Sequence, residues 1–306
     1  MTYPDTSNEK IESQDIQLNE LVTLLWSYRK FIAISSFVFL IFALIYAFSL
    51  PNIYQSTSIL EAEVAYDGKS QAGNSGLEAI TQFAGVSMAG SSGNMGNLAD
   101  ATIRSHDFLK HLIRKDPTFL PKLVAVKKYD PATKGIIYNS KLYDQSSEKW
   151  LISPPTSIQA YNTYLNNLSL SVSRKTGFIT LSYSHQSPVI AAEVVTLIYT
   201  EANSIIRKRA LDEAEATLAY LYPQLENVNQ KEVLTAINGL IAMQLRKLTL
   251  ANIKKNYLLD PIDKPFIPEV KSEPKRFIIL LAGIFLSFAV SFLGVIVWHF
   301  GIRVPD

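Results

Sequence analysis

The side chains that could support acid–base, metal or nucleophilic chemistry are few in this sequence, and we find no complete set. The four histidines, His106, His111, His185 and His299, lack the spacing of metal ligands. Ser184 and His185 are adjacent in sequence, which does not make a nucleophile and a base. The chain has no cysteine, so thiolate ligands, a cysteine nucleophile and disulfides are excluded. We expect a protein that is not an enzyme and that uses no metal or cofactor.

Two groups of carboxylates could in principle pair as a general acid and a general base. Glu61 and Glu63 would share one face of a predicted strand. Asp212, Glu213 and Glu215 lie on a long predicted helix. A solvated strand face and a solvated helix face explain both groups, so neither indicates catalysis.

Charge is only mildly informative about partners. The net charge of the chain is +2, while residues 104–149 hold ten basic and five acidic residues, a net +5. A surface that meets an anionic glycan or a lipid diphosphate would benefit from this excess, and a plain solvated surface explains it nearly as well. We expect no nucleic acid partner.

Two apolar stretches dominate the organisation of the chain. Residues 31–50 and 277–297 carry no charge, and each is long enough to cross a bilayer. Arg29 and Lys30 precede the first stretch, which favours a cytoplasmic N-terminus. A cleaved signal peptide is the alternative, but thirty residues precede the stretch and it is longer than a signal core.

These stretches predict five consecutive parts. They are a cytoplasmic tail (1–30), a first transmembrane helix (31–50), a periplasmic domain (51–276), a second transmembrane helix (277–300) and a cytoplasmic tail (301–306). Asp15 to Tyr28 has helical amphipathic spacing and is predicted to lie along the inner membrane surface. The second transmembrane helix carries four small residues that we predict pack against another helix: Gly283, Ser287, Ser291 and Gly294.

The periplasmic part is predicted to combine an α/β base with a long helical hairpin arm, an α+β fold class. The base comprises residues 51–187 and 257–276, and the arm comprises 188–256. Strand 54–64 and a hairpin around Lys175-Thr176-Gly177 belong to the base. Residues 68–96 are rich in glycine and serine and predict a loop around a short helix, 76–84.

Helical spacing predicts the remaining elements. In the base, we expect helices at 100–115 and 157–167, the second capped by Ser157. In the arm, Ser187 caps a helix that starts at Pro188 and ends at Pro223. A second arm helix runs from about 231 to 256, and four prolines make 258–276 an extended strap.

The second arm helix carries an apolar stripe that one partner helix cannot cover completely. We predict that this stripe contacts neighbouring copies of the chain, so that the protein is a homo-oligomer. The stripe is formed by Leu234, Ile237, Ile241 and Leu245.

Several stretches, in this order, resemble the Wzz-type chain-length determinants, the polysaccharide co-polymerases of Gram-negative inner membranes. LVTLLWSYRKFI and SLPNIYQSTSILE flank the first apolar stretch. SVSRKTGFITLSYSHQSPVIAAEVV resembles the hairpin of the family and the helix start that follows it. IAMQLRKLTLANIKKNYLLDPIDKPFIPEVKSEPKR resembles its closing arm and strap, although Ile262 stands where the family usually has alanine.

The resemblance implies a ring of protomers in the inner membrane, with the periplasmic domains side by side and no catalysis. It implies regulation of the chain length of a lipid-linked polysaccharide such as O-antigen, the glycan of lipopolysaccharide, together with a separate polymerase. Larger relatives add a cytoplasmic tyrosine kinase, and this chain ends at Asp306. Two alternatives remain: an export coupler for capsule or exopolysaccharide that works with a separate kinase, and a two-span sensor.

Overall fold

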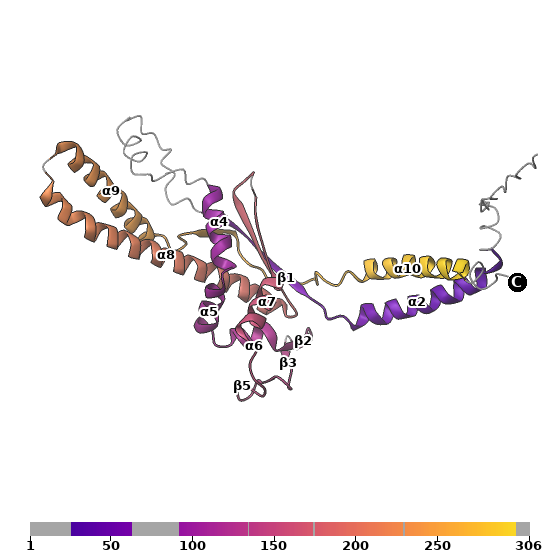
Figure 1. Cartoon of the computed structure of the whole chain (residues 1–306). Coiled ribbons are helices and arrows are strands. Elements are labelled where there is room, and N and C mark those ends of the chain that lie inside the picture. The colour runs from indigo at the N-terminus through magenta and orange to yellow at the C-terminus, as the bar shows by residue number, and fades with distance from the viewer. Residues whose placement is uncertain (1–25, 63–91, 134, 174, 229, 298–306) are drawn as a thin grey trace, which may run out of the picture. The chain divides into compact units, whose positions relative to one another are not determined.

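The computed structural model describes residues 26–62, 92–133, 135–173, 175–228 and 230–297. The chain forms two compact units (Figure 1). The terminal unit comprises the chain up to Pro51 and from Pro274 on, and the central unit is Asn52–Glu273. The predicted amphipathic segment up to residue 25, the helix at 76–84, Glu63, His299 and the C-terminal tail lie outside the described residues.

The terminal unit consists of two apolar helices that pack against each other, α2 (Arg29–Ser49) and α10 (Arg276–Val297). Both are long and apolar enough to cross a membrane. Helix α8 (Pro188–Asn227) of the central unit also meets this criterion, but more than half of its most apolar stretch is buried within the protein. Helices α2 and α10 are mostly exposed along their apolar sides, as expected for helices that face lipid.

A four-stranded antiparallel sheet organises the central unit, in the order β6-β7-β1-β8. Its strands are β1 (Tyr54–Ala62), β6 (Leu168–Val172), β7 (Phe178–His185) and β8 (Leu259–Asp263). The predicted hairpin is confirmed, since β6 and β7 pair across a turn in which Gly177 has a φ of 75°. Every second residue of β1 is buried, which is the period of a strand with one covered face.

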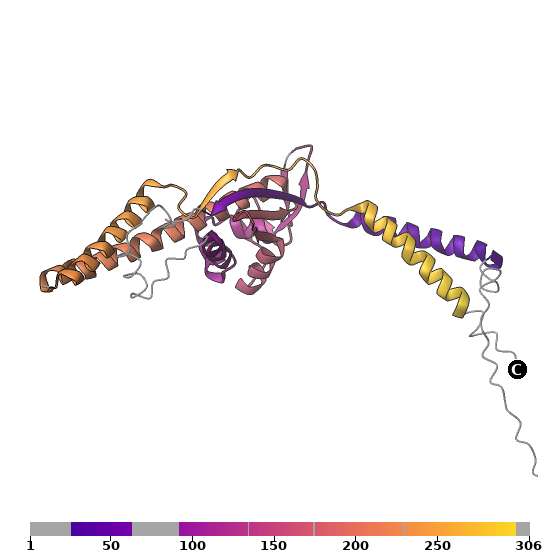
Figure 2. The same ribbon diagram turned by 90° about the horizontal axis from the view of Figure 1, so that it is seen from above.

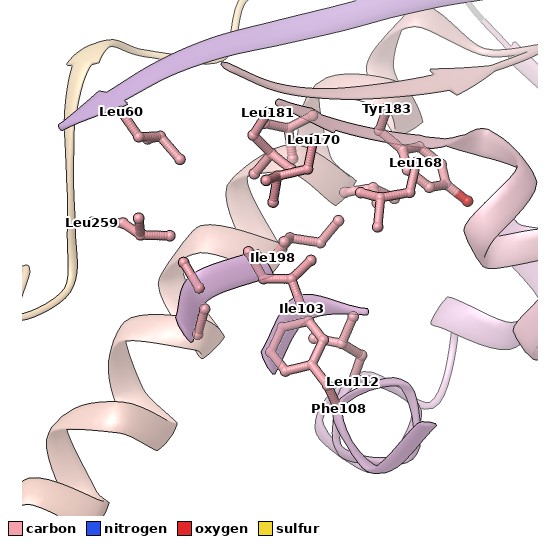
Figure 3. Packing of buried hydrophobic residues seen from close by; sticks show 14 of the residues in the cluster. Leu60, Ile103, Phe108, Leu112, Leu168, Leu170, Leu181, Tyr183, Ile198 and Leu259 are labelled. Carbon is pink, nitrogen blue, oxygen red and sulfur yellow. The ribbon is translucent and has the colours of Figure 1, made fainter. Parts of the chain in front are cut away.

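The core lies between one face of this sheet and the helices beneath it (Figure 3). Leu60, Leu170 and Leu181 point from the strands toward Ile103 and Ile198 on the helices. Four helices pack around this core beside α8: α4 (Ser92–Ile103), α5 (His106–Lys115), α6 (Phe119–Val124) and α7 (Ser157–Asn167).

Two expectations for helices of the base are wrong, although α7 confirms the predicted limits of the helix at 157–167. A single helix was expected over 100–115, but the chain breaks after Ile103, and Ser105 caps α5 by accepting a hydrogen bond from the N–H of Phe108. Helix α7 is capped by Thr156 and not by Ser157, because Thr156 and Gln159 form a reciprocal capping box. The glycine-rich stretch ends earlier than predicted, since Gly96 lies within α4.

Two short antiparallel pairs follow α6. They are β2 (Val126–Asp130) with β3 (Gly135–Tyr138), and β4 (Tyr143–Asp144) with β5 (Lys149–Trp150). Rings hold the second pair to the first: Tyr143 lies 5.4 Å from Tyr138 and 5.4 Å from Trp150 between ring centroids. We call residues 126–133 and 135–152 the small lobe.

The arm consists of α9 (Lys231–Ile253) and the outer part of α8 (Pro188–Asn227), which lie side by side in both views (Figure 2). The predicted start of the arm at residue 188 is wrong, because Ile190, Val194 and Ile198 of α8 lie in the core of the base. Ser187 caps α8 as predicted, with Pro188 in its first turn. The predicted end at Pro223 is wrong, because α8 continues through this proline to Asn227. A proline so close to a helix end removes a single hydrogen bond, and packing of Leu221 and Leu225 against α9 supports the last turn.

Candidate functional site

The polypeptide enters and leaves the central unit at one point. The N–H of Ile53 donates to the carbonyl of Glu273 (2.9 Å), and the N–H of Ser272 donates to the carbonyl of Ile53 (2.9 Å). Two serines of β1 that are fully buried extend this connection by donating to strap carbonyls: Ser56 to Phe266 (2.8 Å) and Ser58 to Asp263 (2.6 Å). The proline strap is therefore fastened along β1.

The arm joins the base at the opposite end of β1, where Ala62 pairs with Leu259. Asn203 of α8 fixes this junction. Its side-chain oxygen accepts from the N–H groups of Leu258 (2.7 Å) and Leu259 (2.8 Å), and its amide donates to the carbonyl of Leu259 (2.8 Å). The Asn203 side chain is buried, and both its oxygen and its nitrogen form hydrogen bonds to backbone groups. It therefore fixes the returning chain against α8.

The small residues predicted on the second apolar helix differ in their surroundings within the terminal unit. A Cβ on Gly283 would lie 2.7 Å from Cβ of Ala43, so α2 and α10 approach closely there. The hydroxyls of Ser291 and Ser35 are 2.9 Å apart, which joins the two helices by a hydrogen bond.

Ser287 is buried but donates to the carbonyl of Ile284 in its own helix (2.7 Å). At Gly294, no described atom lies within 4 Å of an added Cβ. Of the four predicted small residues, Gly283 and Ser291 therefore make close approaches to α2.

The predicted stripe on α9 divides into an inner and an outer part. Ile241 is only 7% exposed, because it packs against Leu218 and Leu221 of α8, and Ile237 packs against the same cluster. Leu234 is half-buried and Leu245 is 44% exposed. Ile241 therefore belongs to the core of the arm, and Leu245 retains the most surface for a contact with another molecule.

His185 is the most deeply buried histidine among the described residues. Its Nδ1 accepts from the N–H of Ser187 (3.0 Å), so Nε2 carries the proton and donates to the carbonyl of Lys122 (2.9 Å). Burial lowers the pKa of His185 to about 4, although the hydrogen bond to Lys122 favours the charged form. The imidazole is neutral at ordinary pH and connects α6 to the start of α8.

Lys122 also forms an ion-pair network beside an apolar groove. Its Nζ lies 3.4 Å from Asp116 and 3.3 Å from Glu193. Burial opposes the charge on Asp116, but the hydrogen bonds from Thr118 and the charge of Lys122 outweigh it and lower the pKa of this carboxyl. The groove, of about 580 Å³, lies between α6, the first turns of α8 and Ile267 of the strap. Its charges are paired, so it presents no free cation to a phosphate.

The other residues considered for chemistry are separated from one another. His106 stacks edge-on against Tyr161, and Glu61 is exposed on β1. Glu213 forms an ion pair with Lys247 (2.7 Å) that bridges the two arm helices. Within the described ranges, no three His, Asp or Glu side chains gather as metal ligands.

Comparison with known proteins identifies the N-terminal third of the chain. Residues 14–115 match the family model Wzz, "Chain length determinant protein". Residues 14–115 are a Wzz domain. This match confirms the resemblance drawn from the sequence motifs. No curated protein sequence matches the chain. Among solved structures, a full-length bacterial polysaccharide co-polymerase aligns at 14% identity with a TM-score of 0.40, over 94% of this chain and 99% of that chain.

The Wzz domain spans α2, β1, α4 and α5, and its last helix is clamped to the rest of the base by a buried carboxylate. Glu201 of α8 is 2.7 Å from Nε2 of His111 and 3.6 Å from Nζ of Lys115 on α5. A buried carboxylate needs such partners.

Sequence reasoning did not find this clamp, the Asn203 junction or the groove. The signal that could have revealed the clamp and the junction was a polar residue at a buried position of α8: Glu201 for the clamp and Asn203 for the junction.

Proposed function

We propose that this chain is a Wzz-type polysaccharide co-polymerase that regulates the chain length of a lipid-linked polysaccharide. The observation that carries the proposal is the match of residues 14–115 to the Wzz domain. The rest of the chain is consistent with it, because a base with a long helical arm stands between two helices that could cross a membrane.

In this proposal the protein is a non-catalytic regulator in the bacterial inner membrane. Helices α2 and α10 span the bilayer, both termini are cytoplasmic and the central unit is periplasmic. Protomers form a ring through their central units, with the exposed part of the α9 stripe around Leu245 in the contact. The ring acts with a separate polymerase on a lipid-linked glycan, of which O-antigen is our preferred example.

Deletion of the gene in the source bacterium tests the function. We expect the surface polysaccharide, separated on a gel, to change from a clustered modal length to a broad distribution dominated by short chains. Plasmid-borne wild-type protein should restore the mode. An unchanged ladder in the deletion strain would contradict the proposal.

The alternative of a capsule export coupler predicts a different result. Deletion would then reduce the amount of exported polymer, with no modal length to lose, and the effect would depend on a separate tyrosine kinase. Measuring both polymer amount and length in one deletion strain separates the two functions.

Membrane topology is tested separately with single cysteines, which are informative because the chain has none of its own. The side chain of Asp107 is 92% exposed, so Asp107→Cys should react with a membrane-impermeant thiol reagent once the outer membrane is permeabilised. Failure to react in intact inner membranes, with reaction after their lysis, would contradict a periplasmic central unit.

A further inference from the structure

The small lobe presents an outward face that combines lysines with exposed aliphatic side chains. In the β2–β3 pair, Lys128 is opposite Ile137, and Tyr129 is opposite Ile136. Neighbouring residues of a strand point to opposite faces. Ile136 packs on the core, and the ring of Tyr129 meets Tyr54 of β1 edge-on at 6.1 Å. Lys128 and Ile137 therefore face away from the base, and Ile137 is 47% exposed.

The residues that follow the β4–β5 pair add further exposed aliphatic side chains. Leu151 and Ile152, which follow β5, are 58% and 53% exposed. Three further lysines of the lobe are exposed: Lys127, Lys141 and Lys149. Lys127 is unpaired at a shift in strand register between Val126 and Lys128, so the regular alternation of faces does not apply to it.

Two acidic residues of the lobe, Asp130 and Asp144, are occupied within turns. Each accepts hydrogen bonds from a backbone N–H and a hydroxyl of the residues that follow it. Tyr138, Tyr143 and Trp150 form a string of ring contacts within the lobe. Lysines, aromatic rings and isolated aliphatic side chains together are typical of protein surfaces at a lipid headgroup layer.

Covalent connectivity keeps the lobe close to the end of the first apolar helix. Tyr54, which Tyr129 contacts, is four residues beyond Leu50, the C-cap of α2. Four residues span at most about 14 Å. The strap adds a second tether, since Glu273, which pairs with Ile53, is three residues before the start of α10. Two short covalent connections, of four and three residues, thus link the root of the lobe to the apolar helices.

We propose that the small lobe docks on the outer surface of the membrane that anchors the chain. Ile137, Leu151 and Ile152 enter the interfacial layer, and Lys127 and Lys128 pair with phosphates of anionic phospholipids. The inference rests on the two-span topology of the proposed function. A second copy of the lobe is a poorer occupant, because the lobe carries four lysines against three acidic residues and like lobes, each with a net positive charge, repel each other. Docking would fix the tilt of the base, and with it the direction of the arm, relative to the bilayer.

The test uses the full-length protein in nanodiscs that contain phosphatidylglycerol, with and without a doxyl-labelled lipid quencher. Single cysteines carry an environment-sensitive fluorophore at Ile152→Cys, at Phe39→Cys in α2 and at Glu232→Cys at the start of α9. We expect lipid quenching at positions 152 and 39 and none at 232.

Charge reversal tests the role of the lysines. We expect Lys127→Glu/Lys128→Glu to lower the docked fraction at position 152 on the order of fivefold or more, since each lysine near an anionic surface contributes about that factor. Lys208→Glu/Arg209→Glu reverses two adjacent basic residues of the arm and should leave quenching unchanged. Lys127→Gln/Lys128→Gln, a milder change, gives the same test if the charge reversal prevents folding.

Four results would overturn the proposal. Quenching at 39 without quenching at 152 would leave the topology intact and refute docking. Protection of position 152 from aqueous iodide without lipid quenching would mean that a protein covers the lobe. Lipid quenching at position 152 that is unchanged in both Lys127/Lys128 double variants would refute the role of the lysines. Absence of quenching at 39 would instead refute the two-span topology of the proposed function, and docking with it.

Discussion

Lowering the pH should destabilise the folded α/β base of the central unit through His185, because only the neutral imidazole fits its site. Protonation would place a proton on Nδ1, where the N–H of Ser187 already donates. Burial holds the pKa of His185 at about 4 in the folded protein, against about 6.5 in the unfolded chain. Between these values the unfolded chain binds more protons, so stability is fully present above about pH 6.5 and falls as the pH is lowered toward 4.

The size of this effect follows from the two pKa values. At pH 5, about 1.5 pH units below the unfolded pKa, His185 should lower the free energy of unfolding by about 2 kcal/mol. In a domain of this size, that loss corresponds to a fall in melting temperature of about 4–8 °C.

The assay is thermal unfolding of the full-length protein in detergent at pH 7.5 and pH 5, followed by circular dichroism. Acid acts on the whole protein, so the informative quantity is the difference between variants. We expect the acid-induced fall in melting temperature to be about 4–8 °C smaller in His185→Gln than in the wild type. His106→Gln removes a partly exposed histidine and serves as the control. Equal falls in His185→Gln and the wild type would refute the reasoning.

Three further substitutions test other parts of the account. Gly283→Leu should disrupt the packing of the two apolar helices and broaden polysaccharide length on gels, while Gly294→Leu, where an added Cβ has no described neighbour within 4 Å, should not; equal effects would refute this. Asn203→Leu leaves three backbone groups unpaired and should lower the free energy of unfolding by about 3 kcal/mol, and the melting temperature by about 6 °C or more, whereas the exposed Asn252→Leu should be nearly neutral. Leu245→Asp should give smaller assemblies by native gel electrophoresis with an unchanged melting temperature; intact assemblies would exclude this residue from the protomer contact.

The parts of the fold that local sequence determines were predictable. The apolar stretches gave the two terminal helices, because length and lack of charge suffice. The serine–proline pair at 187–188 and the Lys-Thr-Gly turn gave the start of α8 and the β6–β7 hairpin, because caps and turns are local signals.

The errors arose where tertiary contacts decide. The break before Ser105 depends on α5 turning to place Phe108 in the core, and the helix through Pro223 depends on contacts with α9. Strand β8 is fixed by pairing with β1, some 200 residues earlier in the chain, which no local pattern reveals.

The candidate site shows the same division. Spacing identified the small residues of the second apolar helix and the stripe on α9, but it did not separate buried Ile241 from exposed Leu245. That distinction depends on where Leu218 and Leu221 of α8 meet α9. The clamp of Glu201 on His111 joins residues 90 positions apart, so only the folded chain brings it into view.

Reconstitution of polymerisation tests the central claim most directly. Proteoliposomes containing the polymerase and lipid-linked repeat units, with or without this protein, would be analysed for the length distribution of the product. The account predicts a modal length only when this protein is present, and an abundance that simply falls with length when it is absent. The same distribution in both preparations would contradict a role in chain-length control.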